Sequence, residues 1–92
     1  MTRSVAEARP RERIEVGGVV VALTHRPPTE APGLVARLDD GTGEIDLVWL
    51  GRRDVPGITP GRRLVAEGMV CTGAHRPTIF NPAYELLRED SP

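Results

Sequence analysis

The 92-residue chain is predicted to be a small all-β barrel. Three observations carry this prediction: two alternating runs that flank an Asp-Gly turn, a paired glycine inside a valine-rich run, and connections too rich in proline and glycine for long helices. The composition, 39% hydrophobic and 27% charged, suits one folded globular domain.

A β-hairpin is predicted over residues 33–50. Side chains alternate over residues 33–39 and 44–50, and Asp40-Gly41-Thr42-Gly43 supplies the turn between them. One face collects apolar side chains and should be buried: Leu34, Ala36, Leu38, Ile45, Leu47 and Trp49. The other face is half polar and can meet water or a ligand: Val35, Arg37, Asp39, Asp46, Val48 and Leu50.

A bent first strand is predicted over residues 14–23, which are rich in β-branched side chains. Gly17 and Gly18 interrupt it, and paired glycines within a strand indicate a bulge or a sharp bend. A strand that bends midway pairs with different neighbours at its two ends, which is how small barrels close. We therefore expect this segment to shape the barrel.

Two more strands complete the barrel. The fourth runs over residues 62–72 and the fifth over residues 77–87, where Pro82 indicates a kink, an edge position or an early end of pairing. An irregular crossing precedes the fourth strand, with Val55 and Ile58 tucked under the barrel.

The predicted domain covers residues 13–88. Residues 1–12 are charged and interrupted by proline, which indicates a flexible N-terminal arm with a helical turn through residues 4–8. Residues 89–92 form a polar tail. Five strands, a bent first strand and an irregular link before the fourth outline a Greek-key OB-fold, with an SH3-like barrel as the main alternative.

Three stretches resemble known OB domains. Residues 38–45 look like the turn between strands two and three of nucleic-acid-binding OB domains, including the anticodon-binding type, and residues 58–68 are similar to the entry into their fourth strand. Phe80-Asn81-Pro82-Ala83-Tyr84 resembles the close of the wedge OB domain of RecG helicase. Residues 48–53 match a run found in small stand-alone OB-fold proteins of GC-rich bacteria. The resemblance implies a module that binds single-stranded or branched nucleic acid, DNA or RNA, across strands two and three.

An OB-fold binds its ligand between the first-to-second and the fourth-to-fifth strand loops. Both loops carry a His-Arg-Pro triplet here, and Arg37 lies between them, so we expect a short cationic track despite the acidic pI. All cationic side chains of the chain are arginines, whose planar fork suits phosphates, although a GC-rich genome also explains this usage. The expected nucleic-acid-binding residues are His25, Arg26, Arg37, Trp49, Arg52, Arg53, His75, Arg76 and Phe80.

The aromatic residues are few, and alternation puts Trp49 in the core with Ile45 and Leu47. A bulge after Asp46 would instead turn Trp49 outward as a stacking platform. Leu50 stands on the outer face where relatives place an aromatic. Phe80 and Tyr84 of strand five have two interpretations: one of them substitutes for that aromatic, or they close the bottom of the barrel.

Several functions find no support in the sequence. We expect no catalysis, cofactor or metal, because the residues show no paired nucleophile and base, phosphate-cradling loop or zinc-ligand spacing. The acidic residues around the hairpin turn are those that such a turn requires, and a cation site is the less favoured interpretation: Asp39, Asp40, Glu44 and Asp46.

Cys71 is the single cysteine, and no apolar run is long enough to span a membrane, so a cytoplasmic location is expected. The net charge of −1 and pI near 6.1 argue against a general polyanion binder, which leaves a protein-interaction module as the alternative function.

Overall fold

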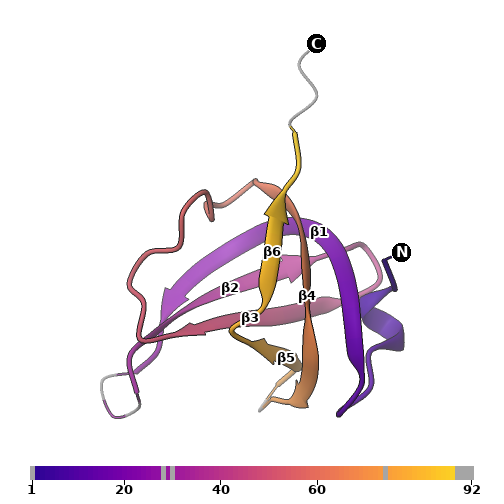
Figure 1. The fold of residues 1–92 in the computed structure, drawn as a ribbon, viewed down its shortest axis with the longest axis horizontal. Coiled ribbons are helices and arrows are strands. Elements are labelled where there is room, and N and C mark those ends of the chain that lie inside the picture. The colour runs from indigo at the N-terminus through magenta and orange to yellow at the C-terminus, as the bar shows by residue number, and fades with distance from the viewer. Residues whose placement is uncertain (1, 28, 30, 74, 89–92) are drawn as a thin grey trace.

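The computed structural model describes residues 2–27, 29, 31–73 and 75–88. The expected polar tail, residues 89–92, lies outside the described residues. In the part of the chain that the structure describes, no helix has the length and apolar character needed to cross a membrane. The elements are a short 3-10 helix and six strands: η1 (Val5–Glu7), β1 (Arg13–His25), β2 (Gly33–Asp39), β3 (Glu44–Leu50), β4 (Arg63–Thr72), β5 (Pro77–Phe80) and β6 (Ala83–Leu86) (Figure 1).

Five strands form a closed ring in the order β1-β2-β3-β5-β4, and β4 pairs back onto β1. All neighbouring pairs are antiparallel except β3 and β5, which run parallel. The bent first strand is confirmed, because β1 pairs with β4 over residues 13–19 and with β2 over residues 19–25. Figure 1 shows β1 curving over the other strands. The all-β, barrel-like fold class is therefore confirmed.

Of the paired glycines of β1, Gly18 allows a close approach of the chain to itself. A methyl group added at Gly18 would lie 2.5 Å from the Asp39 carbonyl oxygen, a contact that no side chain tolerates. At Gly17 the nearest atoms would lie at 3.5 Å or more, which is ordinary contact. The register shift of β1 falls between Val20 and Ala22, beyond the glycines. The irregularity in β1 therefore lies just beyond Val19, the residue at which β1 changes its pairing partner from β4 to β2.

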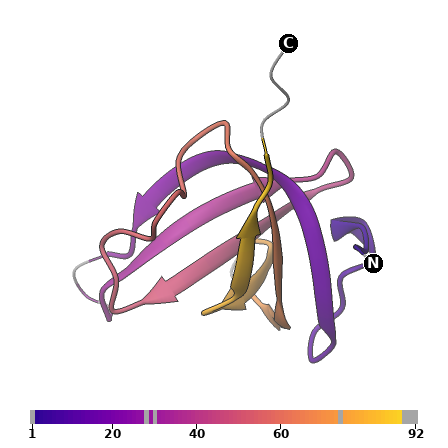
Figure 2. The same cartoon turned by 45° about the horizontal axis from the view of Figure 1, so that its top comes forward.

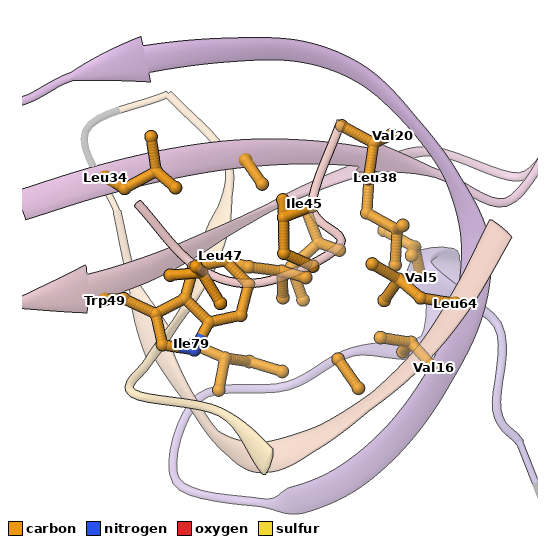
Figure 3. Close-up of a cluster of buried hydrophobic side chains, with 14 of the residues drawn as sticks. Val5, Val16, Val20, Leu34, Leu38, Ile45, Leu47, Trp49, Leu64 and Ile79 are labelled. Atoms are coloured by element: carbon orange, nitrogen blue, oxygen red, sulfur yellow. The ribbon is translucent and has the colours of Figure 1, made fainter. Parts of the chain in front are cut away.

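The hairpin of β2 and β3 pairs from Gly33 with Leu50 to Asp39 with Glu44, as the alternation predicts. Figure 2 shows the two strands side by side beneath β1. The expected apolar face is buried, and it joins side chains of β1, β4 and β5 in one core around which the ring closes (Figure 3). Val55 and Ile58 of the irregular crossing belong to this core, as expected.

The expected fifth strand is divided into β5 and β6 at Asn81-Pro82. Asn81 adopts a φ of 51°, its amide donates to the Val48 carbonyl oxygen at 2.6 Å, and its side-chain oxygen accepts the Leu50 amide at 2.9 Å. Both segments remain antiparallel to β4. The interruption that Pro82 indicates is therefore present, and Asn81 ties it to the end of β3.

The N-terminal segment, expected to be a flexible arm, packs against the barrel. Val5 is only 4% exposed and lies among core residues such as Val16, Leu38 and Leu64 (Figure 3). The helical turn expected over residues 4–8 is present as η1. One buried valine within a charged stretch is too weak a pattern to reveal this docking from the sequence.

Asp40 of the hairpin turn holds this segment in place. Its carboxylate accepts the Val5 amide at 2.8 Å, and the hydroxyl of Thr42 accepts the Ala6 amide at 3.1 Å. Burial raises the pKa of Asp40, but hydrogen bonds from the Thr42 hydroxyl and from the amides of Val5, Thr42 and Gly43 outweigh this effect. The pKa of Asp40 therefore lies below its ordinary value.

Candidate nucleic-acid interface

The candidate interface is the outer face, defined as the side of β2, β3 and β5 that points away from the core. Register places Val35 of β2, Val48 of β3 and Phe80 of β5 in one row across it. Val48 is only 5% exposed, whereas the Phe80 side chain is 42% exposed. Leu50, 38% exposed, follows on β3. The outer face thus has an apolar strip that ends in one accessible aromatic ring.

A basic corner borders one end of the outer face and consists of His25, Arg26, Arg52 and Arg53. These four residues line a hollow of about 320 Å³ together with Pro32 and Gly33. His25 Nε2 lies 3.3 Å from the Arg53 carbonyl oxygen. The two loops that follow β1 and β3 therefore meet here, which brings together four of the predicted site residues.

Arg26 lies over the outer face. A methyl group at Gly33 would lie 3.0 Å from Cδ of Arg26, so the arginine covers Gly33 on the side where a side chain would point. Residues two and four places further along a strand point to that same side, which makes it the side of Val35 and Arg37.

The opposite end of the outer face carries an arginine–carboxylate cluster of Arg37, Glu44, Asp46 and Arg76. Arg76 Nη1 donates to Asp46 Oδ2 at 3.1 Å, and Arg37 Nε lies 3.7 Å from Asp46 Oδ1. Arg76 Nε also lies 4.0 Å from Glu44 Oε1. Two arginines and two carboxylates give the cluster a formal charge of zero. The short cationic track expected from the sequence is therefore neutralised at this end.

The two loop arginines nevertheless border the same face. Arg26 covers Gly33, and Arg76 bonds to Asp46, the register partner of Arg37. Gly33 and Arg37 are four residues apart on β2, a separation of about 13 Å at the usual rise of a strand. His75 is exposed beside Arg76 in the loop between β4 and β5, where both line a second hollow of about 280 Å³.

Trp49 does not reach the outer face, which corrects the expectation that it contacts a base. It is 5% exposed, and its indole N–H donates to the Pro82 carbonyl oxygen at 3.2 Å. Its ring packs edge-on against Tyr84, with centroids 5.5 Å apart, while the Tyr84 hydroxyl donates to the Pro56 carbonyl oxygen at 2.8 Å. Asn81, Pro82 and Tyr84 of the RecG-like motif therefore contact the end of β3 or its side chains, whereas Phe80 is the aromatic residue of that motif that is exposed on the outer face.

The acidic residues of the hairpin region all have local partners. Asp39 Oδ1 accepts the Gly41 amide at 2.7 Å, and Asp40 anchors the N-terminal segment as described above. Asp46 serves Arg37 and Arg76. Among the described residues no group of three potential ligands is arranged to hold a metal ion.

Comparison with solved structures shows which fold the chain has. A replication factor A related protein from Methanobacterium thermoautotrophicum matches with a TM-score of 0.74 and 15% identity, over 95% of this chain and 91% of that chain. An OB domain from Methanosarcina mazei matches with a TM-score of 0.70 and 20% identity, over 96% of this chain and 84% of that chain. The chain is therefore an OB-fold domain.

A comparison of sequences finds similarity to part of a DNA helicase. The chain is 32% identical over 96 residues to the ATP-dependent DNA helicase RecG of Haemophilus influenzae, a match over 96% of this chain. The chain spans 13% of the helicase. No protein-family model matches the chain. The resemblance to RecG that residues 80–84 indicate is confirmed over nearly the whole chain.

Proposed function

We propose that this OB-fold domain is a non-catalytic module that binds single-stranded or branched nucleic acid across its outer face. The observation that carries the proposal is the placement of Phe80, an exposed aromatic ring in register with Val48 on the strip between two arginine-bearing loops. The similarity to a segment of a DNA helicase and to a replication factor A related protein supports it. The same proposal places the protein in the cytoplasm, where its one cysteine stays reduced.

Each part of the face has a role in this proposal. Phe80 stacks on one base, an interaction worth about 1–3 kcal/mol. Arg52 and Arg53, exposed and without an ion pair among the described residues, bind phosphates as the strand leaves the aromatic ring. His25 and Arg26 extend the basic corner, while Arg37, His75 and Arg76 lie at the far end. With two or three phosphate contacts, affinity is modest, and log K falls against log salt with a slope of about −1.4 to −2.

Fluorescence anisotropy with labelled ten-nucleotide strands and a branched duplex, each at two salt concentrations, tests the proposal. Arg52→Gln with Arg53→Gln should weaken binding about tenfold at low salt and flatten the salt dependence. Arg63→Gln with Arg88→Gln removes the same charge from exposed positions outside the proposed interface and is the matched control. Absence of binding at low salt, or equal losses in both double variants, would contradict the proposal.

A second candidate function is docking of a protein partner on the same face. The apolar strip and the neutral arginine–carboxylate cluster favour it, as does a larger hollow of about 660 Å³ that borders the strip at Leu50 and is also lined by Pro56 and Tyr84. Docking of this kind depends on apolar contact and is insensitive to salt, whereas nucleic-acid binding weakens as the salt concentration rises. A folded domain that binds neither strand nor branched duplex in the anisotropy experiment would favour this candidate.

A further inference from the structure

We propose that Asp46 occupies, from within the chain, a phosphate-binding position formed by Arg37 and Arg76, and thereby weakens nucleic-acid binding at that end of the outer face. This inference rests on the proposed function. It assigns Asp46 the role of an internal competitor of the ligand, so that the wild-type domain binds mainly through the basic corner.

The two arginines converge on Asp46 from different elements. Arg37 is the register partner of Asp46 on β2, whereas Arg76 comes from the connection between β4 and β5. Each carboxylate oxygen of Asp46 faces one guanidinium group. Oδ1 lies 3.7 Å from Arg37 Nε, and Oδ2 lies 3.1 Å from Arg76 Nη1. Two guanidinium groups around one small anion form the kind of site that binds a phosphate oxyanion.

The carboxylate fills this site incompletely. Arg37 Nε and Asp46 Oδ1 are both buried, and neither has a hydrogen-bond partner among the described residues. The 3.7 Å that separates them exceeds hydrogen-bond length. A buried donor without a partner carries a desolvation penalty that a better-placed acceptor removes. A phosphate has more acceptor oxygens than a carboxylate and can bond to both arginines at once.

Asp46 cannot leave this position by a backbone movement, because its strand is paired on both sides. β3 pairs with β2 at Arg37 and with β5 at Thr78. A phosphate that approaches the cluster therefore meets a fixed negative charge between the two arginines. Repulsion at this point opposes the attraction that the arginines alone would exert. Removal of the charge, with the shape of the side chain kept, should open the site.

Asp46→Asn makes this change and is compared with the wild type by the same anisotropy titrations. We expect about fivefold tighter binding of a ten-nucleotide strand at low salt, and a salt slope steeper by about 0.7, the value for one additional phosphate contact. Glu67→Gln is the matched control, since it removes one negative charge beside Arg13, away from the outer face. Arg76→Gln added to Asp46→Asn should cancel the gain.

Each outcome is decisive. A wild-type domain that binds neither the strand nor the branched duplex refutes the proposed function. A wild-type domain that binds, with Asp46→Asn no tighter than Glu67→Gln, overturns this inference and leaves the proposed function standing. If a melting experiment shows that Asp46→Asn is not folded, binding by the Arg76→Gln variant tests the inference instead. It should weaken wild-type binding less than twofold, because Asp46 already holds Arg76, and a loss as large as that of the Arg52 and Arg53 double variant overturns the inference.

Discussion

Replacement of Gly18 by alanine tests how the barrel closes. The added methyl group would lie 2.5 Å from the Asp39 carbonyl oxygen, 2.9 Å from its carbon and 3.2 Å from the Asp40 nitrogen. All three are backbone atoms, and Asp39 is paired with Val19 on one side and Glu44 on the other. The clash can be relieved only by separating strands, so we expect Gly18→Ala to cost about 1–3 kcal/mol of stability.

Gly17→Ala is the matched control for this prediction. Its methyl group meets Thr2 Cγ2 at 3.5 Å and Val65 Cγ2 at 3.6 Å, both ordinary contacts with side chains. Alanine also restricts the unfolded chain, which favours the folded state by about 0.4–1 kcal/mol. The two adjacent substitutions should therefore change stability in opposite directions.

Thermal unfolding followed by the fluorescence of the single tryptophan measures both variants. Since 1 kcal/mol shifts the Tm of a domain of this size by about 4–8 °C, Gly18→Ala should melt roughly 5–20 °C below the wild type. Gly17→Ala should melt at the wild-type temperature or a few degrees above it. Equal Tm values for Gly18→Ala and the wild type, or a larger loss for Gly17→Ala, would refute the role of Gly18 in strand crossing.

Three further predictions concern the face, its support and the N-terminal segment. Phe80→Ala should weaken strand binding by about 1–3 kcal/mol without lowering the Tm, whereas Met69→Ala, at an exposed position on β4, should leave anisotropy titrations unchanged. Tyr84→Phe removes the hydrogen bond to Pro56 and should cost about 0.5–1.5 kcal/mol in urea unfolding, and no loss would show that the bond is not formed in solution. Asp40 has a lowered pKa, so its stabilising effect is complete above the unfolded-state value of 3.8 and disappears as pH falls through the folded-state value. Asp40→Asn should therefore be less stable than the wild type at pH 7, and melting curves should show this difference shrinking below about pH 4, while a constant difference would contradict the role of the charge.

Local pattern was sufficient to predict much of the barrel. Alternation placed Leu38 and Ile45 in the core, and the same parity placed Trp49 there, because no bulge interrupts β3. Val55 and Ile58 stood out as the apolar residues of a crossing broken by proline and glycine. These predictions succeed because each depends on residues that are close together in the sequence.

Features that depend on distant parts of the chain were not predictable. The docked Val5 donates its amide hydrogen bond to Asp40, 35 residues away. The pairing of Arg37 with Asp46 follows from the hairpin register, but the arrival of Arg76 depends on the parallel pairing of β3 with β5. Charge counting along the sequence therefore indicated a cationic track, whereas the fold neutralises one end of it.

An NMR titration of the isotopically labelled domain with a ten-nucleotide strand tests the central claim most directly. The amide signals of the outer face and the basic corner, represented by Val35, Val48, Phe80 and Arg52, are predicted to shift together, with a midpoint that rises with salt. Shifts confined to the far side of the barrel around Glu67, or no shifts at low salt, would contradict the claim that nucleic acid binds across β2, β3 and β5.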